Sequence, residues 1–260
     1  MSTVDSNQPY GTPTWIELDV PETGIDRAKE FYGALFGWDF TVADASNGYY
    51  SIGLLRGLPV AGIRQSSTPA APGLWCVYLA TEDCDGTAKR VADAGGTVLV
   101  SPLDVPGLGR RALAQDPTGG LFGLWQGGTH PGCRLVNEPG TLVRNDLATP
   151  DPEPARAFYA EVFDFTLDGN EDLPGFDFTF LRRPDGHEVG GIFGDPAAAS
   201  TGWQTTFEVA DADASVAGAL AAGGTAGPVS DTPYGRMAEI TDPLGNVFGL
   251  IARPAGPIPA

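Results

Sequence analysis

Carboxylate side chains share one face of the first predicted strand. Residues 14–20 alternate Trp15, Glu17 and Asp19 with apolar residues, and this period of two is typical of a strand with one buried face. A carboxylate in apolar surroundings has a raised pKa and can act as a general base. These residues could therefore transfer protons if the polar face of the strand lines a cavity.

A second charged group lies in the other half of the chain. Asp146 follows Arg144 at a spacing of two, and Glu208 lies on a further predicted strand. Arg144 could stabilise an enolate or phenolate oxygen while a carboxylate takes the proton. The alternative is an ion pair of Arg144 with Asp146 or Glu208 that holds the sheet together. The candidate catalytic residues are Glu17, Arg144, Asp146 and Glu208.

Aromatic and polar side chains on the same strands are candidates for substrate binding. Indole and phenol rings stack on flat apolar molecules, and glycine lets a ring approach the backbone. The alternative is that these rings pack the core of a small domain. The candidate binding residues are Trp15, Asp19, Tyr49, Trp75, Tyr78, Trp125, Trp203, Gln204 and Thr206.

The composition limits the partners and the compartment. The chain has 260 residues, with 15 Lys+Arg against 33 Asp+Glu and a formal net charge of −18, so it repels phosphate backbones and anionic lipid. We therefore expect neither a nucleic-acid nor a membrane partner. The N-terminal residues lack the pattern of a secretion signal, and the three cysteines without Cys-x-x-Cys spacing fit reduced thiols. Both features favour a cytoplasmic protein.

Neither histidine is expected to take part in chemistry. His130 lies between Thr129 and Pro131, and His187 follows the turn sequence Pro184-Asp185-Gly186. Residues in such turn-rich segments are typically solvated. We predict that both imidazoles lie at the surface.

The chain is an internal repeat. The pairs Phe31-Tyr32 and Asp116-Pro117 recur as Phe158-Tyr159 and Asp242-Pro243, at offsets of 127 and 126 residues. Self-similarity at one nearly constant offset indicates a duplicated unit. We predict two copies, at residues 12–126 and 140–252, joined by a Gly- and Pro-rich linker at 127–139.

Each copy divides again into two units of the order strand, helix and three strands. The helix of the first unit follows from apolar residues at steps of three and four, with Gly37 as a left-handed stop. The expected elements of that unit are a strand at 14–20, a helix at 23–36 and strands at 38–42, 49–55 and 59–65. The chain therefore carries four βαβββ units and is of the α+β class.

This pattern resembles a known superfamily. Paired βαβββ units, with Phe-Tyr near the helix end and Asp-Pro-x-Gly before the last strand, are similar to the glyoxalase/bleomycin-resistance/dioxygenase superfamily, also called vicinal oxygen chelate. The segments Gly11-Thr12-Pro13-Thr14-Trp15 and Gly123-Leu124-Trp125-Gln126 resemble its two-domain actinobacterial branch. That branch includes a mycobacterial glyoxalase-like antigen and proteins labelled hydroxylases beside aromatic-polyketide genes.

The resemblance implies a place for the substrate. Paired units of the superfamily bend their strands into a U-shaped sheet, with the helices outside and the substrate on the concave side. Trp15, Glu17 and Asp19 would then face the cavity of the first copy, and Arg144 and Asp146 that of the second.

The resemblance also implies where a metal would be held. Members that use a metal place one ligand in the first strand of a unit and a glutamate in the last. The first-strand positions of this chain hold Trp15, Cys76, Arg144 and Gln204. The last-strand positions hold Gly62, Gly123, Gly191 and Gly249. Because glycine has no side-chain donor, and Trp or Arg would fill or repel the metal space, we predict a protein without metal or other cofactor.

Three functions follow as hypotheses. The first is a metal-free enzyme that acts by acid/base chemistry on a hydrophobic aromatic or polyketide-like molecule of secondary metabolism. The second is a protein that binds such a molecule unchanged, for resistance or delivery. The third is a metal-dependent lyase or dioxygenase of the glyoxalase type. The expected partner is a small hydrophobic ligand, and the chain is expected to be a monomer or a homodimer.

Overall fold

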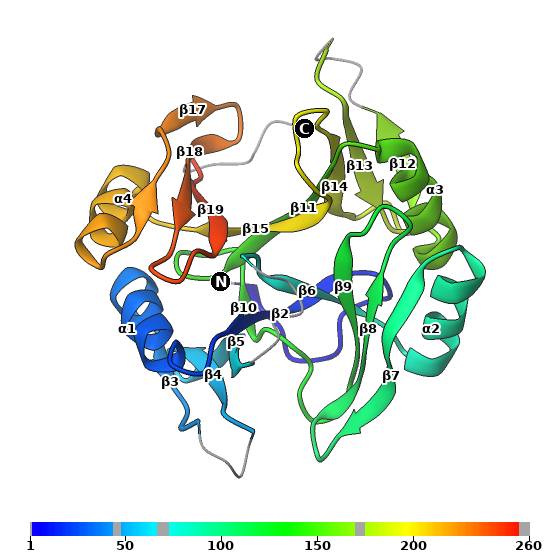
Figure 1. Ribbon diagram of the computed structural model, residues 1–260, viewed down its shortest axis with the longest axis horizontal. Coiled ribbons are helices and arrows are strands. Elements are labelled where there is room, and N and C mark those ends of the chain that lie inside the picture. The colour runs from blue at the N-terminus through cyan, green and yellow to red at the C-terminus, as the bar shows by residue number, and fades with distance from the viewer. Residues whose placement is uncertain (1, 44–47, 67–72, 170–174, 255–260) are drawn as a thin grey trace.

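Two curved sheets, one from each half of the chain, form the molecule. The computed structural model describes residues 2–43, 48–66, 73–169 and 175–254. Figure 1 shows the first half below and the second half above. The α+β fold with tandem units predicted from the sequence is confirmed by the elements of both halves.

The first sheet is built from two units that meet at their first strands. Each unit begins with a strand that runs parallel to its own last strand, and the two first strands pair antiparallel. The helices are α1 (Ile25–Phe36) and α2 (Cys84–Asp93). The strand order is β3 (Asp39–Phe40), β4 (Tyr50–Leu55), β5 (Leu58–Gln65), β2 (Pro13–Val20), β6 (Cys76–Ala80), β9 (Leu121–Gly127), β8 (Gly109–Gln115) and β7 (Thr97–Val105).

The second sheet repeats this arrangement. Its helices are α3 (Pro152–Phe163) and α4 (Ala212–Ala221). The strand order is β12 (Thr166–Gly169), β13 (Phe178–Arg182), β14 (Glu188–Gly194), β11 (Leu142–Thr149), β15 (Gly202–Glu208), β19 (Val247–Ala252), β18 (Gly235–Thr241) and β16 (Thr225–Ala226), with β17 (Ser230–Thr232) paired to β18.

Local sequence explains where the helices begin and end. The buried face of α1 carries Ala28, Phe31, Tyr32 and Phe36, and Gly37 ends the helix in the left-handed region at φ 71°. The Asp83 carboxylate accepts a hydrogen bond from the Gly86 amide at 2.9 Å and so caps the start of α2.

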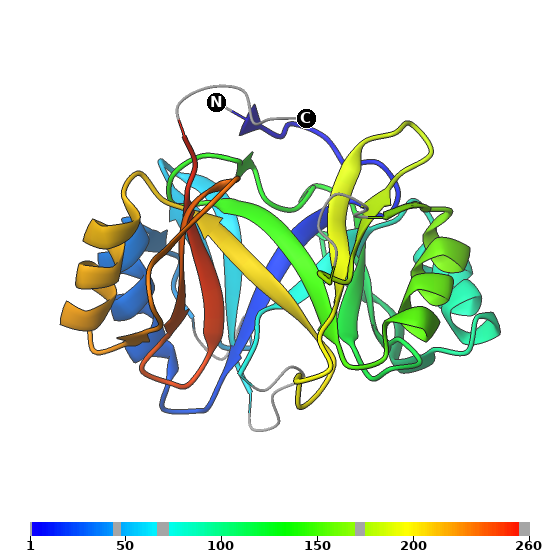
Figure 2. The ribbon, with the colours of Figure 1, turned by 90° about the horizontal axis from the view of Figure 1, so that it is seen from above.

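Helices of one half pack beside helices of the other. Helix α1 contacts α4, and α2 contacts α3, so the helix pairs stand at the two ends of the molecule with the strands between them (Figure 2). The apolar strand faces meet in the middle, where Phe207 of the second half packs on Phe36, Trp38 and Trp75 of the first. The two halves therefore share their hydrophobic cores.

The repeated sequence pairs meet across this interface. The Tyr32 hydroxyl donates to Asp242 Oδ2 at 3.0 Å, and the Tyr159 hydroxyl donates to Asp116 Oδ2 at 2.9 Å. Burial and then the neighbouring aspartate charge raise the pKa of both tyrosines well above the ordinary value, so both stay protonated. Each half thus supplies the donor for one bond and the acceptor for the other.

The segment between the two copies is folded against the first half. Strand β10 (Leu135–Val136) pairs with β1 (Ser2–Thr3), and the Cys133 amide donates to the Thr14 carbonyl at 2.7 Å. Tight anchoring of this kind fixes the path of the whole segment and places His130 over the concave face of the first sheet, as described below.

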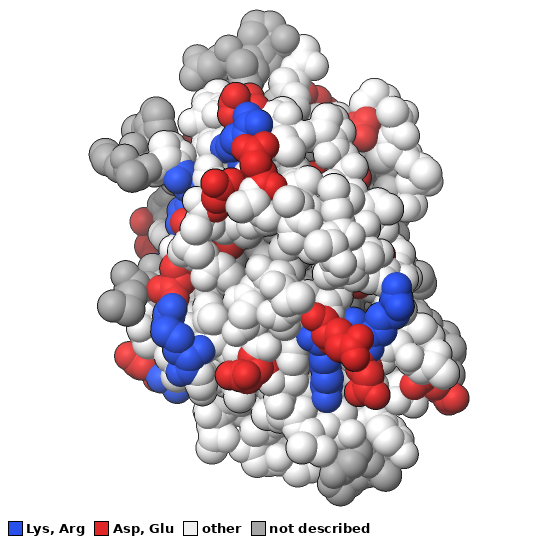
Figure 3. Space-filling view, turned by 90° about the vertical axis from the view of Figure 1, so that its left-hand side faces the viewer, with Lys and Arg blue, Asp and Glu red and all other residues white. Residues whose placement is uncertain are grey.

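Charged residues on the surface form mixed groups. Figure 3 shows the face that carries α1 and α4, where acidic and basic side chains lie next to each other among uncharged residues. Arg236, for example, pairs with Asp213 and Asp231. No helix within the described residues is long and apolar enough to cross a membrane.

Candidate active site on the concave face of the first half

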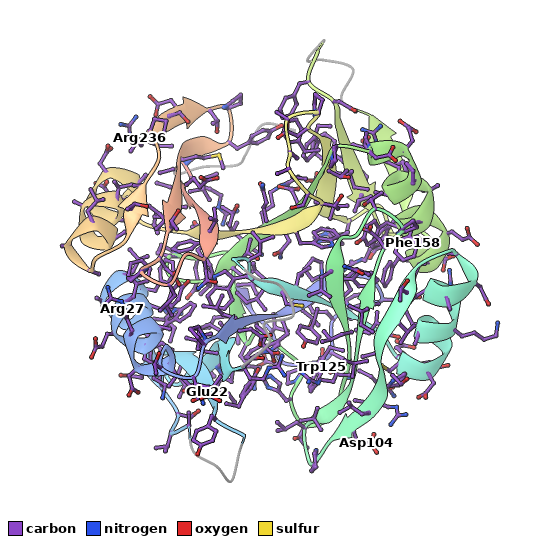
Figure 4. The ribbon with its side chains drawn as sticks, viewed as in Figure 1. Glu22, Arg27, Asp104, Trp125, Phe158 and Arg236 are labelled. Carbon is purple, nitrogen blue, oxygen red and sulfur yellow. The ribbon has the colours of Figure 1, made fainter. Side chains whose placement is uncertain are left out.

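A large cavity lies on the concave face of the first sheet. Its volume is about 710 Å³, within the range of small-molecule sites. Figure 4 shows Trp125 inside the curve of this sheet and Asp104 near the far end of β7. The lining residues are Trp15, Glu17, Thr41, Gly48, Tyr50, Ile52, Arg64, Tyr78, Leu103, Asp104, Val105, Pro106, Leu108, Arg111, Trp125 and His130.

Glu17 is the carboxylate at the floor of this cavity. It is 5% exposed, and its Oε1 lies 3.3 Å from Arg64 Nε and 3.5 Å from an Arg111 Nη. The Tyr78 hydroxyl donates to the same oxygen at 3.3 Å and accepts from Arg111 at 3.1 Å. A carboxylate, a phenol and two guanidiniums therefore meet at one point.

Asp19 holds one of these arginines. Arg64 Nε and Nη each donate to an Asp19 carboxylate oxygen at 2.9 Å. Paired N–H donors of this kind match the two oxygens of a carboxylate and fix its geometry. Asp19 is thus a partner of Arg64, and it is not among the residues that line the cavity.

Two tyrosines act as hydrogen-bond groups in the cavity. Burial, followed by the charge of Glu17, raises the pKa of Tyr50 and of Tyr78 well above the ordinary value. Both rings therefore stay neutral at physiological pH. The Tyr50 hydroxyl also accepts a hydrogen bond from Trp15 Nε1 at 2.9 Å, which fixes the indole along the cavity wall.

His130 forms part of the aromatic wall, so the prediction of a solvated surface imidazole is wrong. Its ring lies edge-on to Trp15, with centroids 4.6 Å apart, and its carbonyl accepts from Trp125 Nε1 at 2.9 Å. Burial, and then the charge of Arg134, lower its pKa from 6.5 to about 4. The imidazole is therefore neutral at physiological pH, and it can accept a hydrogen bond from a ligand or donate one to it.

This lowered pKa predicts a pH-dependent stability. The unfolded chain binds a proton at His130 below about pH 6.5, whereas the folded protein does so only below about pH 4. Between these values the unfolded state holds more protons, so the free energy of unfolding falls as the pH falls. We expect a His130→Gln variant to lose less stability than the wild type between about pH 7 and about pH 5 in urea unfolding. Equal losses in the two proteins would contradict the assignment.

The candidate catalytic residues of the second half do not join Glu17. Arg144 donates to Asp146 at 2.7 and 2.9 Å and to Glu188 at 2.6 Å, and Glu208 pairs with Arg253. Burial raises the pKa of Asp146, and the Arg144 charge opposes this shift. The structure thus shows the ion pair of Arg144 with Asp146, and it brings neither Glu208 nor Glu17 to that pair.

Three of the predicted binding aromatics lie outside the cavity. Trp75 is 1% exposed and packs edge-on to Tyr32, and Trp203 donates to the Tyr159 hydroxyl at 2.9 Å, so both indoles belong to the interface between the halves. Tyr49 is 44% exposed with a left-handed backbone at φ 56°. The ring that lines the cavity is the next residue, Tyr50, because β4 begins at Tyr50 and Tyr49 lies in the preceding turn.

Gln204 and Thr206 line a smaller cavity in the second half. Its volume is about 440 Å³, and Ser230, Thr232 and Glu239 contribute to its walls. The larger cavity of the first half holds Trp15, Tyr78 and Trp125 from the predicted binding set. We therefore place the candidate active site in the first half.

The last-strand glycines are covered by side chains of their own half. A Cβ atom on Gly62 would overlap the Tyr50 hydroxyl, and one on Gly123 would overlap the Tyr78 ring. In the second half Phe178 covers Gly191 in the same way, while a Cβ on Gly249 would lie 2.7 Å from the Thr206 hydroxyl. A larger residue at these positions, including the glutamate that the resemblance implies, would require these side chains to move.

The residues of the first cavity do not fit a divalent metal ion. Its buried carboxylate, Glu17, already has two guanidinium groups beside it, and these would repel a second cation. No three His, Cys, Asp or Glu side chains converge to hold a metal anywhere in the described ranges. The donor set is suited to hydrogen bonding and proton transfer.

Sequence reasoning missed Tyr50, Arg64, Arg111 and His130. Arg64 stands two residues after Gly62 on the same strand face, and Arg111 lies opposite Trp125 in the antiparallel pair of β8 and β9. The period of two along each strand could have placed both arginines on the face that lines the cavity. No local pattern could have found His130, because the tertiary path of its segment places it.

Comparisons with known proteins agree with this architecture. A family model described as the Glyoxalase/Bleomycin resistance protein/Dioxygenase superfamily matches residues 17–124 and 141–250. The fold is similar to that of a Mn(II)-bound glyoxalase from Novosphingobium aromaticivorans, with a TM-score of 0.66 and 18% identity over 93% of this chain and 82% of the other. It is also similar to the 2,3-dioxygenase LapB from Pseudomonas sp. KL28, with a TM-score of 0.64 and 15% identity over 94% and 93% of the two chains.

Two relatives are similar over almost their whole length. CFP32 of Mycobacterium tuberculosis is 38% identical over 249 residues, which cover 93% of this chain and 94% of that protein. The anthracycline biosynthesis protein DauV of Streptomyces sp. (strain C5) is 34% identical over 259 residues, which cover 93% of each chain. The family model matches both halves of the chain, and both relatives are similar over almost the whole chain. The chain therefore belongs to the Glyoxalase/Bleomycin resistance protein/Dioxygenase superfamily.

Proposed function

We propose that this protein binds a flat, hydrophobic aromatic molecule of the polyketide type in the first-half cavity and transfers a proton on it without a metal ion. The observation that carries the proposal is the placement of Glu17, Tyr78 and Arg111 at the floor of a cavity walled by Trp15 and Trp125. Aromatic walls favour a planar ligand, and a convergent polar group at one end orients it.

Relatives named for anthracycline biosynthesis support an aromatic ligand of the polyketide type. Besides DauV, DnrV of Streptomyces peucetius bears this name and is 33% identical over 258 residues. The cavity of about 710 Å³ has room for fused rings. A ligand of this class would lie in the cavity that the two indoles line, with its polar edge toward Glu17.

Glu17 is the proposed proton acceptor. An acidic C–H bond next to a carbonyl of the ligand would break, the proton would pass to Glu17, and the electron pair would form the enolate. The Tyr78 hydroxyl, which donates to Glu17 at 3.3 Å, keeps the carboxylate in place. Returning the proton to another position of the ligand completes an isomerisation in which atoms and charge balance.

Deuterium exchange tests this proposal. 2-Tetralone, a fused aromatic ketone with acidic C–H bonds, is incubated with the protein in D2O and analysed by mass spectrometry, while tryptophan emission reports its binding. We expect quenched emission and exchange faster than in buffer, both unchanged by a chelator. Exchange that requires an added metal ion would contradict the proposal.

Binding without chemistry is the second candidate function. It is favoured by the engagement of Glu17 with Arg64, Arg111 and Tyr78, because these partners already serve the carboxylate as ion-pair and hydrogen-bond partners within the protein. In that case the ligand quenches tryptophan emission, is recovered unchanged and shows no exchange above the buffer rate.

A further inference from the structure

Arg111 has donor groups that the protein leaves available. Its side chain is 18% exposed in the cavity, and one Nη donates to the Tyr78 hydroxyl at 3.1 Å and lies 3.5 Å from Glu17. A guanidinium carries five N–H donors in a planar fork. Among the described residues, no other oxygen accepts a hydrogen bond from Arg111. The fork can therefore receive a ligand oxygen.

The neighbouring arginines, unlike Arg111, are each held by aspartate carboxylates at short distances. Arg64 is held by both oxygens of Asp19 at 2.9 Å. Arg110, adjacent in sequence, donates to Asp85 and Asp104 at 2.8 Å. Arg111 is thus the least neutralised of the three guanidiniums.

The second half shows that the fold does not need this arginine. Arg111 lies opposite Trp125 in the pair of β8 and β9, and Met237 lies opposite Ile251 in the matching pair of β18 and β19. The preceding arginines, Arg110 and Arg236, pair with aspartates in both halves. The strand pair therefore forms with methionine at this position, and the charge of Arg111 serves the first cavity.

We infer that Arg111 binds the ionised oxygen of an acidic phenol or enol on the aromatic ligand, and that the proton of this hydroxyl passes to Glu17. This inference rests on the proposed function and names the substrate class more narrowly. Where the ligand carries such a hydroxyl, Glu17 takes the O–H proton in place of a C–H proton. The O–H bond breaks, its proton joins a Glu17 oxygen, and the electron pair stays on the ligand oxygen beside Arg111. The charge of the complex is unchanged.

Charge balance favours the hydroxyl over an anion formed in solution. Two carboxylates and two guanidiniums, Glu17, Asp19, Arg64 and Arg111, are formally neutral together. The chain carries a formal charge of −18, which disfavours the approach of anions. A neutral hydroxyl can enter and ionise inside, where the departing proton neutralises Glu17. Among the described residues, Tyr50, Tyr78 and Cys76 also lie near Glu17, and His130 lines the same cavity.

Three anthraquinone probes test the inference. Anthraquinone lacks an acidic group, 2-hydroxyanthraquinone carries a phenol, and anthraquinone-2-carboxylate carries an anion with no proton to give. Binding is followed by tryptophan quenching and by the visible spectrum at about pH 6, where phenols are neutral in water. We expect the bound 2-hydroxyanthraquinone to show its phenolate band and to bind about tenfold more tightly than anthraquinone.

The Arg111→Met variant introduces the residue that the second half carries. We expect it to weaken 2-hydroxyanthraquinone binding by about ten- to a hundredfold and to abolish the phenolate band, while anthraquinone affinity stays within about twofold. Arg111→Lys keeps the charge and should restore part of both signals. Arg182→Met, on β13 of the second half, is the matched control and should behave like the wild type. Circular dichroism melting checks that each variant is folded.

Each contrary outcome has its own meaning. A neutral spectrum of the bound phenol, with affinity unchanged in Arg111→Met, overturns the inference and leaves aromatic binding intact. Tighter binding of the carboxylate than of the phenol also overturns it, because the site would then select anions formed beforehand. If none of the three probes quenches tryptophan emission, the proposed function itself fails.

Discussion

A Glu17→Gln variant is expected to exchange the acidic hydrogens of bound 2-tetralone about 10²- to 10⁴-fold more slowly than the wild type. The amide keeps an oxygen for Tyr78, Arg64 and Arg111 but cannot take up the proton. Ligand binding should persist, because the aromatic walls are unchanged. The initial rate of deuterium incorporation, measured at saturating ligand, gives the comparison.

Asp146→Asn is the matched control for this variant. Asp146 occupies the corresponding strand position in the second half, where it lies opposite Gly191 as Glu17 lies opposite Gly62. Its loss should leave the exchange rate within about twofold of the wild type. A slow Asp146→Asn variant beside a normal Glu17→Gln variant would move the chemistry to the second half.

A Phe207→Ala variant is expected to lose about 3–5 kcal/mol in the free energy of unfolding. Phe207 is fully buried, and its ring centroid lies 4.8 Å from that of Phe36 and 5.4 Å from that of Trp75. Removing it opens a cavity between the halves, and the surrounding side chains fill such a cavity only in part. Urea unfolding followed by circular dichroism measures the loss.

The same experiment tests whether the halves unfold together. Because the cores are shared, the variant should unfold in one transition at a lower urea concentration. Phe176→Ala, at an aromatic ring that is 45% exposed, should cost less than about 1 kcal/mol. A second transition, with the first half as stable as before, would contradict a common core.

The repeated Phe-Tyr and Asp-Pro motifs predicted the fold because they have structural roles in both copies. Phe31-Tyr32 and Phe158-Tyr159 end as buried rings at the interface, and the aspartates that follow at Asp116 and Asp242 accept from those tyrosines. Sequence comparison found the recurrence. That the partner of each tyrosine lies in the opposite half could not be found, since a periodic pattern carries no information about which copy supplies the contact.

Part of the site also followed from strand alternation. Trp15, Glu17 and Tyr78 line the cavity on the strand face that alternation predicted, whereas Asp19, predicted on the same face, pairs with Arg64 instead. Trp75 lies just before β6 and packs at the interface between the halves. Strand alternation therefore does not predict the direction of its side chain.

The remaining site residues depend on tertiary structure. Periodicity can place Arg111 on the cavity face, but only its hydrogen-bond partners show that its donors are incompletely used. His130 joins the site only because the segment after β9 packs its ring on Trp15. Composition and periodicity describe neither feature. The contacts of Arg111 and of His130 join residues that lie far apart in the sequence, and a sequence pattern does not show which distant residues meet.

The two halves have diverged in charge while keeping one architecture. The first half retains a carboxylate with two arginines in an aromatic cavity, whereas Arg144 of the second half is paired with Asp146 and Glu188 and lies over the Phe178 ring. Such a saturated ion pair stabilises the sheet. This division agrees with one half that carries the site and one that supports it.

A crystal structure of the protein with 2-hydroxyanthraquinone tests the central claim most directly. We expect the rings in the cavity lined by Trp15 and Trp125, with the hydroxyl oxygen within hydrogen-bonding distance of the Arg111 guanidinium and of Glu17. We expect no anomalous signal of a metal in that cavity. A metal ion coordinated by Glu17, or the ligand bound in the second half with the first cavity empty, would contradict it.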